Sequence, residues 1–384
     1  MGGLKRIAIL GSTGSIGQQT LEVARVLKGQ LSVAGLGAGS NTELLASQIR
    51  EVQPRMVSFN GPKAELRRSL SPGRTSLPEV VTLEEMASHP DVDLVLIATS
   101  GKAGLAPTLA AIRARKEVAL ANKEVLVMAG AMVMAEARKY GVKIRPVDSE
   151  HSAIWQCLKG ERKKGVARLL LTASGGPFLR YPAKKLEAIT PEQALNHPTW
   201  KMGKKVTIDS ATLMNKGMEV IEAHWLFGVP YSRIGVVVHT ESIVHSMVQF
   251  ADGSIKAQLS RPDMRLPIQY ALGYPDRHFN PDLPMMDWDR AMALNFEPPD
   301  LAKFPCLRLA REAGEKGGTY PAVLCAADEV AVEKFLSHRI GLLDIARLVE
   351  DALEHHRSTR RPSLDEVLEA DAWARRHAGK WRAR

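Results

Sequence analysis

The sequence of 384 residues predicts an α/β fold with an N-terminal parallel-sheet domain, a mixed α+β middle domain and a helical C-terminal domain. Two observations carry this prediction. Short apolar runs alternate with helical patterns through the first third of the chain, as in βαβ units. From residue 307 onward, apolar residues recur only at helical spacing. At roughly 100–200 residues per domain, a chain of this length should contain two or three domains.

The pattern of apolar residues in the N-terminal third predicts strands and helices in strict alternation. Because alternating strands and helices form right-handed crossovers, the strands should pair in parallel in one sheet. The predicted strands cover 6–10, 31–36, 56–59, 94–98, 118–120 and 142–147, and the predicted helices cover 18–27, 43–51, 106–115 and 129–139.

The pattern changes after residue 148. Buried strands are predicted at 168–171 and 234–238, and a hairpin is predicted where 243–250 and 255–259 flank Asp252 and Gly253. A hairpin requires antiparallel pairing, so the middle sheet should be mixed. A loop rich in Pro and Asp covers 273–289, and the helices predicted after it cover 307–314, 322–336 and 340–354.

Composition excludes several classes of protein. The net charge of +10 is scattered, and its densest runs, 357–361 and 375–384, lack interleaved aromatic residues, so we expect solvated helical surfaces and no nucleic-acid partner. Since the chain has no apolar stretch of about 18 residues and no signal-peptide pattern, we expect no membrane association and a cytoplasmic location. Cys157, Cys306 and Cys325 are too widely spaced for a zinc knuckle or a disulfide framework.

A glycine-rich turn, Gly11 to Gly17 with the spacing GxxGxxG, joins the first strand to the first helix. Glycines allow a pyrophosphate to approach the backbone, and a helix N-terminus offers free N–H groups and a positive dipole end. The turn therefore favours a dinucleotide or phosphate site over a turn with a purely structural role.

The second strand ends at 37–41 without the acidic residue that hydrogen-bonds the ribose 2′-hydroxyl in NAD sites. Small and amide-bearing side chains stand there instead, including Ser40 and Asn41. This leaves room for a 2′-phosphate and favours NADP; the alternative is an ordinary helix-capping turn.

Two carboxylates, Asp148 and Glu150, follow the last strand of the N-terminal sheet. If this segment is extended, residues two apart point to the same side. A hard divalent cation would offset the repulsion between the two carboxylates. A solvated turn is the alternative.

A second polar run covers 209–219. On a helix, Asn215, Lys216 and Glu219 share one face, because they are three and four residues apart. An amide, an ammonium group and a carboxylate, with Ser210 just before them, suit a phosphate beside a metal ion. A capped helix with an ion pair is the alternative.

Two further segments have the composition of binding loops. The segment 173–178 (ASGGPF) ends a predicted strand with a turn that exposes its backbone, and 197–205 is a Pro- and Gly-containing loop that carries Trp200. Such loops can cradle a phosphate or close over a substrate; a plain turn and a plain surface loop are the alternatives. His224, His239 and His245 are expected to have structural roles.

These motifs together resemble the 1-deoxy-D-xylulose 5-phosphate reductoisomerase family, almost from end to end of the chain. The matching segments are GSTGSIG at 11–17, LANKE at 120–124, PVDSEHSAIWQ at 146–156, ASGGPF at 173–178, HPTWKMGKK at 197–205, IDSATLMNKGMEVIEAHWLF at 208–227, HTESIVHSMVQFADGS at 239–254 and PDMRLPIQYAL at 262–272. The first domain is accordingly expected to be Rossmann-like.

The resemblance implies the domains, the cofactors and the assembly. The expected domains are an NADPH-binding domain (1–148), a catalytic, metal- and substrate-binding domain (149–285) with a flap (197–205), a linker (286–306) and a helical domain (307–384). The expected cofactors are NADPH and Mg²⁺, Mn²⁺ or Co²⁺, and the expected assembly is a homodimer.

The resemblance also implies a role for individual residues. The expected NADPH-binding residues are Thr13, Gly14, Ser15, Ile16, Gly39, Ser40, Asn41, Asn122, Glu124 and Gly203. The expected metal ligands are Asp148, Glu150 and Glu219, which with Lys123 form the expected catalytic set. The expected substrate-binding residues are Lys123, Ser149, Glu150, Ser174, His197, Trp200, Ser210, Asn215, Lys216 and Glu219, with Met264 close by.

The implied reaction is the NADPH-dependent rearrangement and reduction of a phosphorylated keto sugar, 1-deoxy-D-xylulose 5-phosphate, to 2-C-methyl-D-erythritol 4-phosphate in the non-mevalonate isoprenoid pathway. Many family members have Arg or Lys where Ser40 stands, and Asn at the positions of Cys325 and Asp328. Two alternatives are a semialdehyde or homoserine dehydrogenase-like NADP oxidoreductase, for which Cys157 is the candidate nucleophile, and a non-enzymatic NADPH-binding sensor.

Overall fold

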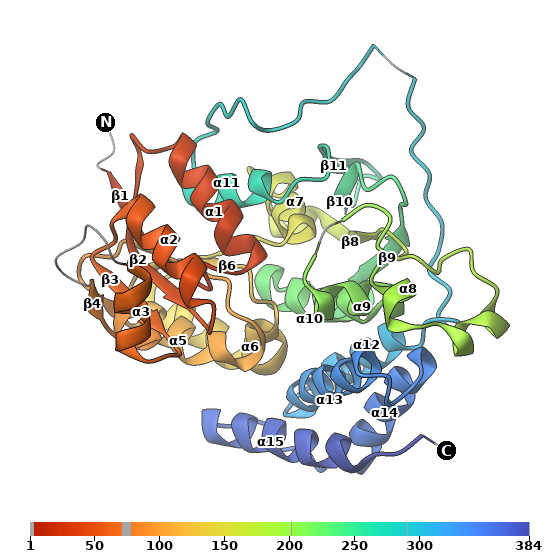
Figure 1. Ribbon diagram of the computed structural model, residues 1–384. Helices are drawn as coiled ribbons and strands as arrows, with labels where there is room; N and C mark the ends of the chain where they lie inside the picture. Colours follow the sequence, from red (N-terminus) through yellow and green to blue (C-terminus); the bar gives the residue numbers. More distant parts are fainter. Residues whose placement is uncertain (1–3, 71–77, 201, 290, 384) are drawn as a thin grey trace. The chain divides into compact units, whose positions relative to one another are not determined.

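The computed structural model describes residues 4–70, 78–200, 202–289 and 291–383 (Figure 1). The chain forms two compact units, each assembled from separate stretches of sequence. Unit 1 comprises Met1–Val125, Ala131–Ser152 and Asp263–Pro284, and unit 2 comprises Leu126–Gly130, Ala153–Pro262 and Met285–Arg384.

Unit 1 is built on a parallel sheet with the strand order β4-β3-β2-β1-β5-β6-β7. Its strands are β1 (Lys5–Leu10), β2 (Leu31–Ala38), β3 (Met56–Phe59), β4 (Glu79–Val80), β5 (Leu94–Ile97), β6 (Glu117–Leu120) and β7 (Ile144–Pro146). The order reverses between β1 and β5, which makes the carboxyl ends of these two strands the switch point where doubly wound sheets bind ligands.

The helices of unit 1 connect its strands and cover the sheet. They are α1 (Ser15–Val26), α2 (Thr42–Val52), α3 (Lys63–Leu70), α4 (Leu83–Ser88), α5 (Leu105–Arg113) after the 3₁₀ turn η1 (Gly101–Gly104), α6 (Glu124–Tyr140), which kinks at Ala129, and α11 (Arg265–Gly273). The core joins strand residues such as Ile7, Ile9 and Leu96 to helix residues such as Leu45 and Ile49.

The helix α11 comes from far along the chain and completes unit 1. Its Ile268, Ala271 and Leu272 lie in the same core, and Arg145 on β7 donates to the Ala271 carbonyl at 2.9 Å. This segment falls within the range 149–285 that was expected to form the catalytic domain. The functional division into NADPH-binding, catalytic and helical domains stays a prediction.

Unit 2 contains a mixed sheet with the order β11-β10-β8-β9. The strands β8 (Val166–Ala173) and β9 (Ile234–Val238) are parallel, whereas β10 (Val244–Phe250) is antiparallel to both β8 and β11 (Ile255–Leu259). The predicted hairpin is confirmed: Gly253 has φ +87°, and the Asp252 side chain accepts from the Ser254 backbone. The remaining short elements are α7 (Ser149–Cys157), η2 (Lys163–Gly165), η3 (Ala183–Ala188), α8 (Pro191–Ala194), α9 (Lys204–Thr212), α10 (Met214–Phe227) and η4 (Tyr231–Arg233).

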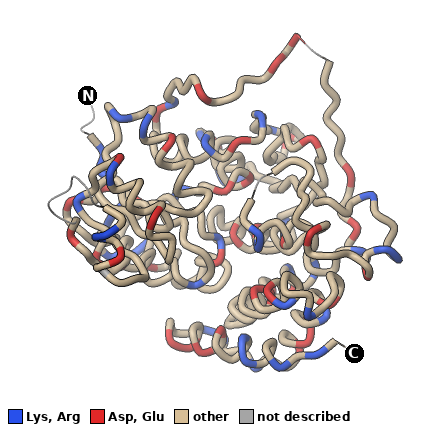
Figure 2. Tube along the Cα trace, viewed as in Figure 1, with Lys and Arg blue, Asp and Glu red and all other residues tan. Residues whose placement is uncertain are grey.

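Helices pack together at the C-terminal end of unit 2 (Figure 1). They are α12 (Cys306–Lys316), α13 (Tyr320–Leu336), α14 (Leu342–His355) and α15 (Leu364–Lys380). The first three were predicted from the sequence, whereas α15 was not. Its N-terminus nevertheless carries a capping box, in which the side chains of Ser363 and Glu366 each accept from the backbone N–H of the other residue. Figure 2 shows acidic residues toward the start of α15 and basic residues toward its end, the charge order that a helix dipole favours.

The predicted linker, 286–306, is held to unit 2 by specific contacts in its described part. Glu297 pairs with Val238 as an antiparallel bridge, and Lys303 donates to the carbonyls of Phe178 and Leu179, both at 2.8 Å. Among the described residues, every helix is too short or too polar to cross a membrane.

Candidate active site

The glycine-rich turn lies at the carboxyl end of β1, at the switch point of the sheet. Gly11 has φ +99°, and a Cβ there would lie 2.3 Å from the Ala98 carbonyl oxygen; at Gly17 it would lie 2.2 Å from the Gly11 carbonyl oxygen. Only glycine fits both positions. In the described segment around Gly14, no side chain caps α1 and its first turn has no acidic residue, so Thr13 to Ile16 present a helix N-terminus suited to a pyrophosphate.

The end of β2 caps the next helix and also exposes its backbone. The Asn41 side chain accepts from the Leu44 backbone N–H at 3.1 Å and so caps α2. Gly39 and Ser40 are exposed, and a Cβ on Gly39 would meet no atom within 4 Å. The helix-capping alternative therefore holds for the Asn41 carboxamide oxygen, while the surrounding backbone is open to a ligand.

The residues that follow β6 are held by Asn122. Its buried amide donates to the Thr99 and Gly101 carbonyls, both at 2.8 Å, and its carbonyl accepts from the Val125 backbone N–H at 3.2 Å. Asn122 thus joins the turn after β5 to the start of α6. It fixes the backbone that carries Lys123 and Glu124.

The carboxylates after β7 do not lie on an extended segment, so that prediction was wrong. The helix α7 begins at Ser149, and the Ser152 backbone N–H donates to the Asp148 carbonyl. Glu150 is therefore in the first helical turn, where a carboxylate is favoured by the dipole, and its Oε2 accepts from the Ser149 hydroxyl at 2.7 Å.

A lysine from the neighbouring strand end meets Asp148. Lys123 Nζ lies 2.5 Å from Asp148 Oδ2, because β6 and β7 are adjacent parallel strands and both residues follow their carboxyl ends. Burial alone would raise the pKa of Asp148, but the positive charges of Lys123 and His151 outweigh it and hold that pKa below its usual value. Unit 1 therefore presents an ionised carboxylate next to a lysine at the edge of its sheet.

In unit 2, three elements bring polar side chains around the ring of His197. Its Nε2 lies 3.1 Å from the hydroxyl oxygens of both Ser174 and Ser210. Its Nδ1 accepts from the backbone N–H groups of Thr199 and Trp200, so we assign the ring proton to Nε2. Burial lowers the pKa of His197, which favours this neutral ring.

The turn after β8 is packed directly against α9. Gly176 has φ +68°, and a Cβ there would lie 2.7 Å from the Ser210 carbonyl oxygen. This close approach, which glycine alone allows, holds Ser174 and Ser210 near each other although 36 residues separate them.

The junction of α9 and α10 positions a second polar set. Leu213 has φ +60°, a left-handed conformation that is strained for a leucine and re-aims the chain. In the first turns of α10, Asn215 Nδ2 donates to Glu219 Oε1 at 2.6 Å and Lys216 Nζ donates to Glu219 Oε2 at 2.5 Å. The helical face predicted from the sequence is confirmed, and Glu219 and Lys216 are buried.

The described part of the predicted flap, which omits residue 201, begins at His197 and runs into α9. Trp200 is half-buried, and its ring centroid lies 6.2 Å from that of His245. Gly203 is exposed and precedes α9. The Trp200 ring is therefore next to His245, while its backbone N–H donates to His197, the histidine that contacts the two serines.

A buried ionic cluster, which was not predicted from the sequence, lies beside this set. Lys205 Nζ lies 2.6 Å from Asp209 Oδ2 and 2.7 Å from Asp328 Oδ2. Burial, and then the Asp328 charge, raises the pKa of Asp209 well above its usual value. The i,i+4 spacing of Lys205 and Asp209 signals that pair, but nothing local to either residue signals Asp328.

The described cysteines are free and buried, and the three histidines expected to be structural have backbone partners. Cys157 is buried in α7, and its burial raises the pKa of its thiol to about 11, which argues against a nucleophilic role. His224, His239 and His245 each lie within hydrogen-bond distance of a backbone carbonyl, at 2.8, 2.8 and 3.2 Å.

Comparisons with known proteins identify the family of the chain. Family models described as 1-deoxy-D-xylulose 5-phosphate reductoisomerase match residues 7–130, and models of its C-terminal domains match 144–227 and 259–377. The chain is 55% identical over 380 residues to the reductoisomerase of Heliobacterium modesticaldum, covering 98% of this chain and 97% of that one. The chain belongs to the 1-deoxy-D-xylulose 5-phosphate reductoisomerase family.

Two solved structures show what relatives of the chain bind. A reductoisomerase in complex with NADPH, fosmidomycin and magnesium has a TM-score of 0.92 at 39% identity, with 98% of both chains covered. The Zymomonas mobilis reductoisomerase in complex with NADPH has a TM-score of 0.90 at 40% identity and the same coverage. The α/β fold predicted from the sequence is confirmed, and the chain is an NADPH-dependent, divalent-metal-dependent reductoisomerase of isoprenoid biosynthesis.

Proposed function

We propose that this chain converts 1-deoxy-D-xylulose 5-phosphate to 2-C-methyl-D-erythritol 4-phosphate, and we assign the binding of cofactor, metal and substrate to separate groups of its residues. The observation that carries the proposal is the set around His197, where two hydroxyl groups from different elements meet one imidazole N–H. Three neutral donors in one place suit a phosphate group.

We propose that the turn of Thr13, Gly14, Ser15 and Ile16 holds the NADPH pyrophosphate. The uncapped start of α1 and the glycine-only backbone at Gly11 and Gly17 fit that group. Gly39, Ser40 and Asn41 would lie along the adenosine 2′-phosphate, where Ser40 offers a hydroxyl group rather than a positive charge. The backbone fixed by Asn122, with Glu124 and Gly203, would face the nicotinamide.

The proposed metal ligands are Asp148, Glu150 and Glu219. Carboxylate oxygens are the donors that Mg²⁺ and Mn²⁺ prefer, and the depressed pKa of Asp148 keeps that ligand ionised. When bound, the divalent ion supplies Lewis-acid polarisation of the substrate oxygens. Lys123 and Ser149 would contact the same substrate oxygens.

The proposed phosphate site consists of Ser174, His197, Ser210, Asn215 and Lys216. Its role is to fix the end of the substrate that does not react, so that binding energy orients the carbons that do. The neutral His197 ring would donate through Nε2, and Lys216 would supply the positive charge. Glu219 pairs with both Asn215 and Lys216, which links the phosphate site to the metal ligands.

The first test of this proposal is loss of NADPH absorbance with 1-deoxy-D-xylulose 5-phosphate, run with Mn²⁺ and again with excess chelator. Oxidation should require the metal. Ser210→Ala should then raise the substrate KM by roughly 10-fold, the value of a hydrogen bond to a charged group, while Ser254→Ala, in the β10–β11 turn, should change nothing. An unchanged KM for Ser210→Ala would remove the phosphate assignment.

We propose that the segment 197–205 closes over the substrate through Trp200. Its half-buried ring lies beside His245, so closure would add an apolar cover over the phosphate set. Trp200→Ala should weaken substrate or fosmidomycin binding, whereas Trp288→Ala, an exposed tryptophan of the linker, should not. Equal inhibitor affinity in the two variants would remove the flap assignment.

We also propose that the chain acts in the cytoplasm as a homodimer. Its end-to-end similarity to the family supports the dimer, and its similarity to a bacterial biosynthetic enzyme supports the location. Sedimentation of the purified chain at several concentrations tests the assembly, and a monomer at all of them would contradict it.

A further inference from the structure

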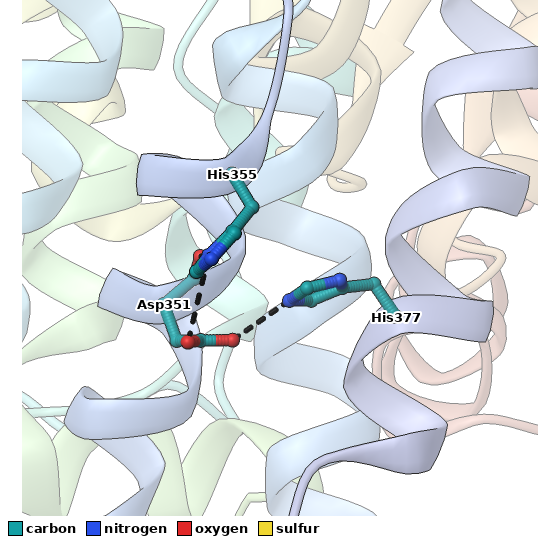
Figure 3. A group of neighbouring side chains, drawn as sticks. All are labelled: Asp351, His355 and His377. Carbon is teal, nitrogen blue, oxygen red and sulfur yellow. Dashed lines mark hydrogen bonds and ion pairs between the residues drawn. The ribbon is translucent and has the colours of Figure 1, made fainter.

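A cluster of one carboxylate and two imidazoles joins the last two helices of unit 2 (Figure 3). Asp351 and His355 lie on α14, and His377 lies on α15. His377 Nε2 is 2.7 Å from Asp351 Oδ2, and His355 Nδ1 is 3.5 Å from Asp351 Oδ1. One potential ligand atom from each residue lies within 4.8 Å of the other two.

The local sequence explains why the three side chains meet. Asp351 and His355 are four residues apart on α14 and so share one helical face. The same helix packs against α15, which brings His377 to that face. His355 is also the last residue of α14, where the helix dipole favours a positive charge.

Neighbouring side chains orient the His377 ring and hold the nearby His356 in a separate contact. Trp373 stacks on His377 with ring centroids 5.0 Å apart and planes at 20°, which sets the orientation of the His377 ring. His356, the next histidine along, has its Nε2 2.7 Å from the Thr319 hydroxyl oxygen and is engaged there. The cluster of Asp351, His355 and His377 is thus a defined set of three donors.

We propose that Asp351, His355 and His377 bind a borderline transition-metal ion such as Zn²⁺, with a ligand set that shares no residue with the reductoisomerase metal ligands. Two imidazoles and a carboxylate are the donors that Zn²⁺ accepts, whereas Mg²⁺ prefers oxygen alone. Tetrahedral ligands about 2.0–2.1 Å from Zn²⁺ are roughly 3.3 Å apart. The 2.7 and 3.5 Å separations run to the two different oxygens of Asp351, and the three ligand atoms lie within 4.8 Å of one another, so side-chain rotations would bring them to that spacing around an ion.

The two imidazoles of the cluster are partly open to solvent. The side chain of His355 is 61% exposed, and that of His377 is 27% exposed. His355 also lines a cavity of about 480 Å³ with Thr319 and Trp373. To ligate through Nδ1, His355 would give up the 2.8 Å contact with the Asp351 carbonyl; ligation through Nε2 would need a ring rotation.

Such an ion would cross-link α14 to α15. The last helix packs on α13 and α14 and is otherwise joined to α14 by a short connection. Anything that binds only the folded arrangement raises the stability of that arrangement. The ion would therefore hold α15 in place rather than take part in the reductoisomerase reaction.

The test is a titration of the full-length, untagged protein with Zn²⁺ in saturating Mg²⁺. Metal analysis after dialysis gives the number of zinc equivalents retained, and scanning calorimetry gives the melting temperature with and without zinc. The variants are His377→Gln and His355→Gln. The matched control is His338→Gln, whose side chain is also 61% exposed and pairs with Glu192. Retained reductoisomerase activity with Mg²⁺ shows that each variant is folded, and His355, on the surface, is the variant least able to disturb packing.

The wild type and His338→Gln should retain one more equivalent of Zn²⁺ than either cluster variant, and their melting temperature should rise with zinc while that of the cluster variants does not. Equal zinc stoichiometry in the wild type and both cluster variants would overturn the proposal and leave only an ion-paired histidine cluster.

Discussion

Two buried lysine–carboxylate clusters lie in unit 2, and they differ in how their carboxylates are bonded. On α10, one lysine, Lys216, meets one carboxylate, Glu219, whose second oxygen accepts from Asn215. Beside it, one lysine, Lys205, meets two carboxylates, Asp209 and Asp328.

The second cluster is also incompletely bonded. Among the described residues, neither Asp209 Oδ1 nor Asp328 Oδ1 accepts a hydrogen bond. The raised pKa of Asp209 follows from its burial and from the Asp328 charge, and it means that a proton relieves the repulsion. In the first cluster the two oxygens of one carboxylate accept from Asn215 and Lys216. In the second, two carboxylates contact one lysine, and a proton relieves their repulsion.

The largest expected effect of a substitution in the two clusters is at Glu219. Glu219→Gln removes a proposed metal ligand while keeping the hydrogen bond from Asn215, so turnover should fall by more than about 100-fold, beyond the roughly 10–100-fold loss typical of residues that only support a ligand. NADPH affinity, measured by fluorescence, should stay within about 2-fold, and Glu161→Gln on the surface should behave as wild type. Lost NADPH affinity with normal metal dependence would show that Glu219 is not a metal ligand.

The second cluster should matter for stability. Lys205→Met leaves two buried carboxylates without their cation, which should lower the free energy of unfolding by about 3 kcal/mol, the lower end of the range for breaking a buried pair. The lower end applies because the Lys205 side chain is 25% exposed. Urea denaturation measures the loss.

The control for Lys205 is a surface ion pair. Lys256→Met removes the partner of Glu161, a pair whose side chains are 50% and 33% exposed. Exposed pairs contribute about 0–1 kcal/mol, so this variant should unfold close to wild type. Equal losses in the two lysine variants would contradict the difference drawn between buried and exposed pairs.

A smaller effect is expected from Asp328→Asn, which removes the excess charge and introduces the residue that family members usually have. Because the pKa of Asp209 is raised in the folded state, the folded state binds more protons than the unfolded state above the ordinary Asp pKa of about 3.9. Wild-type stability should therefore fall as pH rises from about 4 through the raised pKa of Asp209.

Asp328→Asn should flatten that slope and stabilise the protein at neutral pH by about 1 kcal/mol, close to the value of one pKa unit. Urea denaturation at a series of pH values measures the slope. Parallel stability profiles for the variant and the wild type would mean that the two carboxylates do not share a proton.

Local patterns in the sequence predicted much of the fold. The alternation of apolar strands with helices predicted the parallel sheet, and Asp252 with Gly253 predicted the hairpin, because both signals act within a few residues. The spacing of Asn215, Lys216 and Glu219 predicted their shared face for the same reason. The predicted extended geometry at Asp148 and Glu150 was wrong because the helix α7 begins one residue after the first carboxylate.

The sequence by itself determined the glycine turn, the polar face of α10 and the family, since each depends on adjacent residues or on long motifs. Only the tertiary structure decided that α11 completes the core of unit 1, that Asp328 joins Lys205 across more than a hundred residues, and that His377 meets Asp351. The physical reason is packing. Burial of apolar faces brings distant helices together, and local sequence preferences do not indicate which polar side chains then come into contact.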